Sequence, residues 1–177
     1  MSHQALVIVD VQVGAFDGVR DPPLASGERL LERVCALLDA ARAAGLPIVF
    51  VQDCGRVGGA YEEGTPHWRL HPALAPRPGE RVVKKRRASA FDGTALASTL
   101  AALDVRELVA CGQRSEGCLW STCLDALAAG LALTLVSDAH GTLGEHAADV
   151  IARVNRELAE RGASVQEVAR VVAGWRA

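Results

Sequence analysis

Three reactive types of side chain follow apolar runs in this sequence: a carboxylate at Asp10, an ammonium at Lys84 or Lys85, and a thiol at Cys118. Each run is typical of a buried strand. The carboxyl ends of parallel strands meet at one edge of a sheet, where ligands bind. A carboxylate can take the proton of a thiol, and an ammonium beside both groups keeps the carboxylate ionised. Together the three types predict a nucleophilic site built on a cysteine.

Cys118 lies where a glycine-containing loop that starts at Gly112 turns into a predicted helix, with Ser115 as the expected N-cap. Free N–H groups and the positive end of the helix dipole would favour a thiolate there and could hold an oxyanion. The alternative is that Cys118 packs as a small hydrophobic residue. The other cysteines in apolar runs are assigned to the core, and they are Cys35, Cys111 and Cys123.

The other two members of the site also have structural alternatives. Asp10 ends an apolar run, and as a strand-terminal aspartate it could equally cap a helix or form a turn. Lys84 and Lys85 are consecutive, so in an extended chain they point to opposite faces and only one can serve the site. The basic run from Lys84 to Arg87 also fits a solvated edge. Spacing alone does not choose between the two lysines.

A metal site has weaker support. His67 and His71 stand four residues apart, but they lie in a proline-bounded loop. A spacing of four residues brings two side chains to the same face only in a helix. Asp53 is a third possible ligand, so a metal site remains a minor hypothesis. No glycine-rich phosphate loop of either standard type is present. We therefore expect neither a metal nor an organic cofactor.

Alternating strands and helices must position these groups. The expected strands are 5–9, 47–51, 82–83, 108–111 and 131–136, with a last edge strand at 164–165. The expected helices are 28–44, 94–103, 119–129 and 146–161, followed by a short helix from 166. This alternation predicts an α/β fold with three layers and a doubly wound, mainly parallel sheet of about six strands. Residues 54–80 are rich in Gly and Pro and predict a long ordered loop or lid. Asp138 and His140 are expected after the fifth strand.

Length and composition limit the class of protein. The 177 residues suffice for one domain, 1–177, with a substantial core, since half of them are hydrophobic and 23% are charged. The net charge of -2 and the 4% aromatic content argue against nucleic-acid binding. No apolar stretch is long enough to cross a bilayer, so no membrane association is expected. Five irregularly spaced cysteines do not form a disulfide framework, which favours the cytoplasm.

Ordered motifs along nearly the whole chain resemble the isochorismatase-like cysteine hydrolase superfamily, which includes nicotinamidases and N-carbamoylsarcosine amidases. The most specific is Gly112-Gln-Arg-Ser-Glu-Gly-Cys118 followed by Thr122, similar to the family's G-x-x-[ST]-[DE]-x-C…T signature. The others are Ala5-Leu-Val-Ile-Val-Asp-Val-Gln12, Gly64-Thr-Pro, His71-Pro, Lys85-Arg-Arg-Ala-Ser-Ala-Phe91, Gly93-Thr94, Asp125-Ala126, Ser137-Asp138-Ala139, Glu145-His146 and Asn155.

The resemblance implies a triad with Cys118 as nucleophile, Asp10 as base and Lys85 as ion-pair partner. It selects Lys85 because the family's lysine stands four residues before the serine of Ser-Ala-Phe. It also implies a cis peptide at Gln113–Arg114, with the backbone N–H groups of Arg114 and Cys118 as the oxyanion hole. The implied reaction is hydrolysis of a C–N bond in a small amide through a thioester. A homo-oligomer, dimer or tetramer, is expected because relatives commonly assemble.

The sequence also departs from parts of the family pattern. Family nicotinamidases hold a metal through an Asp, a His two positions later and another His, whereas here Gly55 stands two positions after Asp53. A metal-bound nicotinamide is therefore disfavoured. Two alternatives remain, vinyl-ether hydrolysis of the isochorismatase type and a non-enzymatic ligand binder or thiol sensor. The expected substrate pocket, shaped in part by a lid at 61–68, comprises Gln12, Phe16, Asp53, Trp68 and Trp120.

Overall fold

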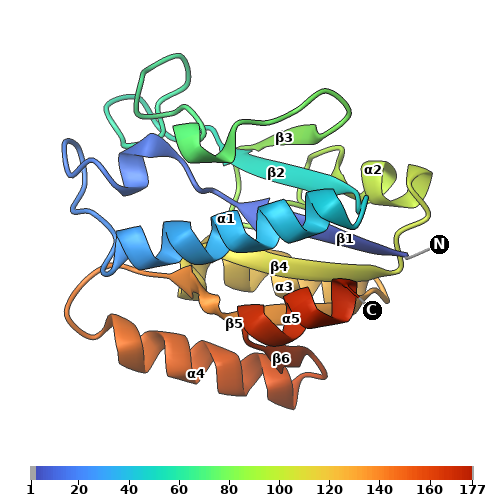
Figure 1. The fold of residues 1–177 in the computed structure, drawn as a ribbon. Coiled ribbons are helices and arrows are strands. Elements are labelled where there is room, and N and C mark those ends of the chain that lie inside the picture. The colour runs from blue at the N-terminus through green and yellow to red at the C-terminus, as the bar shows by residue number, and fades with distance from the viewer. Residues whose placement is uncertain (1–2, 177) are drawn as a thin grey trace.

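A computed structural model describes residues 3–176 and contains one six-stranded sheet (Figure 1). In chain order the strands are β1 (Gln4–Val9), β2 (Ile48–Asp53), β3 (Arg81–Lys85), β4 (Glu107–Gln113), β5 (Ala132–Gly141) and β6 (Ser164–Gln166). Their spatial order is β3-β2-β1-β4-β5-β6, and each neighbouring pair is parallel. This confirms the predicted doubly wound α/β fold.

Helices cover both faces of the sheet. They are α1 (Gly27–Ala43), α2 (Leu96–Ala102), α3 (Trp120–Ala128), α4 (Ala147–Glu160) and α5 (Val168–Trp175). Helices α1 and α5 pack together on one face, which is the near side in Figure 1. Helices α2, α3 and α4 contribute to the core on the other face. The three layers follow because a buried parallel sheet needs apolar cover on both sides.

Strand β1 shows how the sheet divides the core. Ala5, Val7 and Val9 point toward the α2–α3–α4 side, whereas Leu6 and Ile8 point toward α1 and α5. All five are buried, which explains why the run is continuously apolar rather than alternating. Burying both faces of β1 makes it the rigid centre of the sheet.

The strand order reverses between β1 and β4, and this switch point is where open α/β sheets bind ligands. Asp10 directly follows β1, and the segment leading to Cys118 directly follows β4. One expectation about this edge was wrong, because Asp138 and His140 lie within the longer β5 rather than beyond it. Asp138 instead accepts the backbone N–H of Val168 at the start of α5.

Residues 54–80 form the predicted long connection, which contains only a short 3₁₀ turn at Pro72–Leu74 and two isolated bridges.

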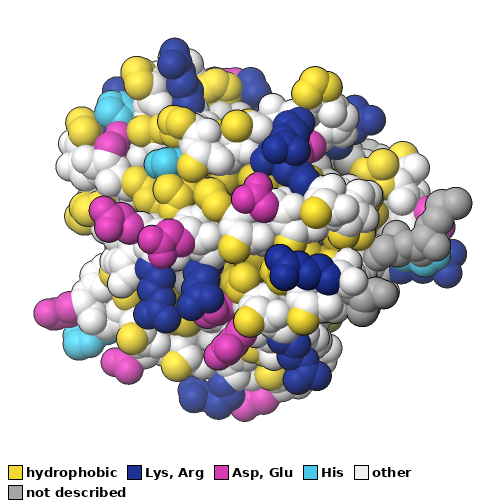
Figure 2. All heavy atoms as spheres, in the orientation of Figure 1, with side chains coloured by type: hydrophobic (Ala, Val, Ile, Leu, Met, Phe, Trp, Pro, Cys, Tyr) yellow, Lys and Arg dark blue, Asp and Glu magenta, His cyan; other side chains and the backbone are white. Residues whose placement is uncertain are grey.

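On the face shown in Figure 2, acidic and basic side chains are interspersed with apolar atoms and do not form separate acidic and basic patches. None of the helices in the described part of the chain combines the length and apolar character that a bilayer crossing requires.

Candidate active site

Asp10 is held rigidly at the end of β1. Its backbone has φ 52°, a left-handed conformation that Asp tolerates better than most residues. Its N–H donates to the carbonyl of Val51 at 3.0 Å, and its own carbonyl accepts from the Gln113 side chain at 2.7 Å. The residue is 1% exposed. The expectation that Asp10 is desolvated is therefore confirmed, and its carboxylate faces the end of β4.

Lys85 is the last residue of β3, and its ammonium is buried among acidic groups. Nζ lies 2.9 Å from Asp10 Oδ2 and 3.0 Å from Asp53 Oδ1. Lys84 points the other way, pairs with Glu63 and lies over the ring of Trp68. The alternation of the strand thus places Lys85 at the site and Lys84 on the surface.

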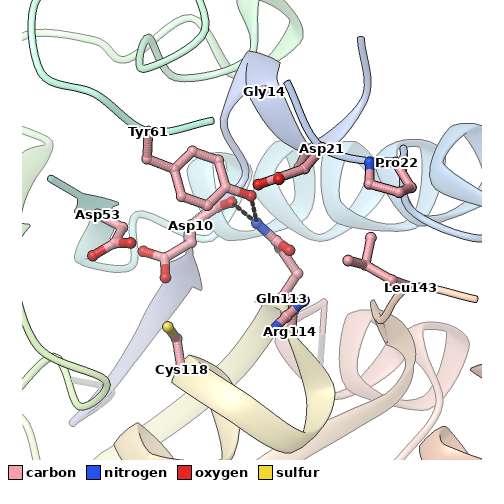
Figure 3. A pocket seen from close by; sticks show the side chains of 11 residues that line it. Asp10, Gly14, Asp21, Pro22, Asp53, Tyr61, Gln113, Arg114, Cys118 and Leu143 are labelled. Carbon is pink, nitrogen blue, oxygen red and sulfur yellow. Dashed lines mark hydrogen bonds between the residues drawn. The ribbon is translucent and has the colours of Figure 1, made fainter. Parts of the chain in front are cut away.

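Cys118 lies in a π-helical turn, Ser115–Leu119, that joins β4 to α3. Its Sγ is 3.2 Å from Lys85 Nζ. Figure 3 shows the Asp10 carboxylate beside the Cys118 thiol, and Asp10 Oδ1 accepts no hydrogen bond from any group in residues 3–176. The peptide bond Gln113–Arg114 just before the turn is cis, as the resemblance implied. One acceptor atom of Asp10 is therefore available for the proton of Cys118.

Burial governs the protonation of these groups. It raises the pKa of Asp10 to about 7, although the Lys85 ammonium works in the opposite direction. Burial and the Asp10 charge raise the pKa of Cys118 to about 12, again against Lys85. Burial alone would lower the pKa of Lys85, but the charges of Asp10 and Cys118 outweigh it and raise that pKa. Burial and Asp10 therefore oppose the thiolate that the helix dipole and Lys85 favour, and the pKa of Asp10 lies in the range suited to a base.

Asp53 ends β2 and is positioned by Gln12. The Gln12 amide accepts the Asp53 N–H at 2.8 Å and donates to the Asp53 carbonyl at 3.0 Å. The Asp53 carboxylate pairs with Lys85, so one buried ammonium is shared by two carboxylates. An ammonium shared between two carboxylates stabilises the ionised form of Asp10 less than an ammonium that paired with Asp10 alone.

A cavity of about 210 Å³ opens beside Cys118. Figure 3 shows Asp10, Asp53 and Cys118 on one side of it and Asp21 further away, beyond Tyr61 and Gln113. Its lining residues are Asp10, Gly14, Ala15, Asp21, Pro22, Asp53, Tyr61, Gln113, Arg114, Cys118 and Leu143. The volume suits a small substrate or one group of a larger one.

Four residues of the expected pocket do not line this cavity. Gln12 is fully buried beneath it, and the Phe16 ring packs edge-on against His71. The backbone carbonyl of Trp68 accepts from Gln12, while its ring lies under Lys84. Trp120 begins α3 and contacts Arg161. Asp53 alone of the five lies at the cavity, because the other four pack beneath or away from it.

Four lining residues outside the expected pocket lie in loops, and they are Asp21, Pro22, Tyr61 and Leu143. Tyr61 belongs to the expected lid, and its hydroxyl accepts from Gln113 Nε2 at 2.6 Å. The hydrogen of Tyr61 is therefore free to donate elsewhere, and burial raises the pKa of this phenol, so the hydrogen is retained. Asp21 precedes two prolines in a loop that shows no periodic pattern. A polar residue beside a Pro-Pro pair was the only signal that could have suggested it.

A chain of hydrogen bonds supports the turn that carries Cys118. Ser115 Oγ lies 2.8 Å from His140 Nδ1, and His140 Nε2 lies 2.9 Å from Asn155 Oδ1. Asn155 in turn donates to the carbonyl of Ser137 at 3.2 Å. Ser115 is therefore not the helix N-cap that was expected, because its hydroxyl binds His140 instead. Burial lowers the pKa of His140, which keeps the imidazole neutral within this chain.

The residues considered for a metal do not fit one. His67 pairs with Asp17, His71 Nδ1 accepts the N–H of Ala73, and the Asp53 carboxylate pairs with Lys85. Within residues 3–176, no three His, Cys, Asp or Glu side chains converge in a way that could hold an ion.

The remaining cysteines are all free thiols. Cys111 and Cys123 are buried as expected, and so is Cys54. Cys35 was assigned to the core, but it is partly exposed on α1 because it lies at the edge of the helix's apolar stripe.

The fold and site define a doubly wound α/β protein with a cysteine, a carboxylate and an ammonium at its topological switch point. Residues 4–170 match the Isochorismatase domain, and the chain therefore belongs to the isochorismatase family.

Relatives and solved structures agree with this assignment. The chain is 38% identical over 161 residues to streptothricin hydrolase of Streptomyces noursei, covering 90% of this chain and 58% of that protein. It is 29% identical over 179 residues to ureidoacrylate amidohydrolase of Variovorax paradoxus, covering 81% and 70%. It superimposes on an isochorismatase from Pseudomonas putida KT2440 with a TM-score of 0.88 and 32% identity, covering 95% and 89%. The chain thus spans little more than half the length of streptothricin hydrolase.

Proposed function

We propose that this protein is a cysteine hydrolase that cleaves a C–N bond of a small amide. The observation that carries the proposal is the contact of Cys118 Sγ with Lys85 Nζ at 3.2 Å, beside a carboxylate with a free acceptor atom. The names of the two relatives, a hydrolase and an amidohydrolase, support the same class of reaction.

The first half of the reaction forms a thioester. As Cys118 Sγ attacks the carbonyl carbon, its proton passes to Asp10, and the carbonyl oxygen becomes an oxyanion. The backbone N–H groups of Arg114 and Cys118 are the proposed donors to that oxyanion. The C–N bond then breaks, and the leaving nitrogen takes the proton from Asp10. Lys85 keeps Asp10 ionised at the start and stabilises the thiolate as it forms.

The second half restores the enzyme. Asp10, ionised again, takes a proton from a water molecule that attacks the thioester carbon. The C–S bond breaks, the sulfur regains the proton from Asp10, and the carboxylic acid leaves. Because Asp10 accepts and returns a proton twice, a pKa of about 7 suits it to work near neutral pH.

Incubation with streptothricin and with ureidoacrylate, followed by mass spectrometry of the products, tests this function. We expect hydrolysis of at least one, with Cys118→Ala reducing the rate by about a thousandfold or more. Cys35→Ala is the matched control and should retain activity, because this thiol lies on α1 away from the cavity. Turnover by Cys118→Ala at the normal rate would contradict the proposal.

The same variants separate the two alternatives. Vinyl-ether hydrolysis of isochorismate should survive Cys118→Ala but not the loss of Asp10. A thiol sensor should show reversible oxidation of Cys118 without turnover. The lining of the cavity contains Cys118 but no second cysteine that could resolve an oxidised form. This composition favours hydrolysis over sensing.

The assembly and the cellular location are also proposals. We propose a homo-oligomer that acts in the cytoplasm on a small molecule and needs no nucleic acid. Sedimentation at micromolar concentration tests the first point, and a monomer there would contradict it.

A further inference from the structure

Asp21 places a carboxylate at the cavity beside Cys118, and this carboxylate has no partner among the described residues. It is one of the lining residues, and in Figure 3 it points toward Tyr61 and Gln113. Among residues 3–176, no hydrogen bond or ion pair occupies its side chain. Its charged neighbours on the same loop are used differently, because Asp17 pairs with His67 and Arg20 pairs with Glu62.

The loop holds Asp21 in place. Pro22 and Pro23 follow it, and a residue before proline is restricted to extended conformations. After the prolines, Leu24 donates to the carbonyl of Ala15 at 2.8 Å. Before them, Arg20 donates to the carbonyl of Gly59 at 2.8 Å. An anchored carboxylate loses little conformational freedom when it binds a ligand, which favours recognition.

The charges around the cavity favour a cation. Three carboxylates line it, those of Asp10, Asp21 and Asp53, against one lining cation, Arg114. The ammonium of Lys85 lies beneath the cavity and is already shared by Asp10 and Asp53. Asp21 therefore contributes an uncompensated negative charge, away from the sulfur but in the same cavity.

We propose that Asp21 is a specificity-determining residue that binds a positively charged group of the substrate, an ammonium or a guanidinium. The favoured substrates are then amides that carry a cation some atoms away from the scissile carbonyl. This inference rests on the proposed function, because only that function makes the bound molecule a substrate. The charge preference of the cavity can nevertheless be measured without any turnover.

The probe is the modification of Cys118 by three methanethiosulfonate reagents of similar size, one with an ammonium, one neutral and one with a sulfonate. The sulfur of Cys118 displaces methanesulfinate and forms a mixed disulfide, which peptide mass mapping quantifies. The rate at the partly exposed Cys35 provides an internal reference. The measured quantity is the ratio of the cationic to the anionic rate at Cys118.

We expect Asp21→Asn to lower this ratio by about three- to tenfold and Asp21→Lys to lower it further. High salt should shrink the difference between wild type and Asp21→Asn. The matched control is Glu160→Gln, which removes an exposed carboxylate at the end of α4 and should leave the ratio unchanged. Because Asp21 is exposed, these variants should fold normally.

A ratio that Asp21→Asn leaves unchanged would overturn the inference. So would a ratio that changes only in Arg114→Gln, because charge selection would then belong to Arg114. A chain without amidase activity would still show the charge preference at Cys118. Failure of this inference and failure of the proposed function are therefore distinguishable.

Discussion

Lys85 Nζ lies 3.2 Å from Cys118 Sγ, although the two residues are 33 positions apart in the sequence. The contact spans the switch point of the sheet, because Lys85 ends β3 and Cys118 follows β4. Lys85 therefore connects the proposed nucleophile to the carboxylates of Asp10 and Asp53.

Replacing the two adjacent lysines separately tests this arrangement. Lys85→Ala leaves two carboxylates without their cation inside the protein, and we expect a loss of about 3 to 5 kcal/mol in the free energy of unfolding. It should also raise the pKa of Cys118 further and abolish turnover, since Lys85 opposes the effect of burial on that pKa. Lys84→Ala should change little, because Lys84 pairs at the surface with Glu63. Chemical denaturation and rate assays measure both effects, and equal losses from the two variants would contradict the assignment.

The pH dependence of hydrolysis should follow Asp10. The carboxylate must be ionised to accept the thiol proton, so the rate should rise with pH through about 7. The negative charge of Asp53 helps to raise the pKa of Asp10. Asp53→Asn removes that charge and leaves Lys85 to Asp10 alone, so the rise should move to lower pH, by up to about one unit. A rise that stays in place or moves to higher pH would show that another group controls the rate.

Sequence reasoning predicted the parts of the site that rest on strand ends. Asp10 was expected at the edge of the sheet because an apolar run precedes it, and the parallel sheet brings it close to Asp53 at the end of β2. The choice of Lys85 over Lys84 needed the family resemblance as well, since alternation alone says only that one of them faces inward. The helix dipole and Lys85 favour a Cys118 thiolate, whereas burial beside Asp10 opposes one, and spacing alone could not weigh these effects.

The loop residues of the cavity could not be predicted in the same way. Asp21 and Tyr61 reach the cavity through backbone contacts between distant segments, such as Gly14 with His67 and Gly55 with Tyr61. No periodicity encodes such contacts. For the same reason, Trp120 was expected at the pocket but contacts Arg161 on α4.

Gly112 should be irreplaceable for a steric reason. Its φ is 116°, and a Cβ atom there would lie 2.1 Å from the carbonyl oxygen of Val9. Because that contact is with the backbone of β1, relief requires the strands to separate. We expect Gly112→Ala to lower the free energy of unfolding by about 3 kcal/mol or more. Gly174→Ala is the matched control, since a Cβ there meets no atom within 4 Å, and it should be neutral or slightly stabilising. Equal unfolding midpoints for the two variants would contradict this reading.

His140 should make stability depend on pH. Burial lowers its pKa below 6.5, so in mildly acidic solution the unfolded chain binds a proton that the folded chain does not. The free energy of unfolding should therefore fall as the pH drops below about 6.5, by at most about 1.4 kcal/mol per pH unit from this residue. His140→Gln should remove that contribution, which a series of denaturation curves would show as a flatter dependence. If the free energy of unfolding of His140→Gln depends on pH as steeply as that of the wild type, then a group other than His140 causes the dependence.

The central claim is that Asp10 takes the proton of Cys118, and alkylation by iodoacetamide with peptide mapping tests it most directly. We expect that near neutral pH Cys118 reacts ahead of Cys35, which is also partly exposed, at a rate that rises as Asp10 ionises around pH 7. Asp10→Asn should remove the rise of the Cys118 rate around pH 7 while leaving Cys35 unchanged. If Cys118 reacts no faster than Cys35 and is indifferent to Asp10→Asn, then Asp10 does not activate it and the proposed nucleophile is a packing residue.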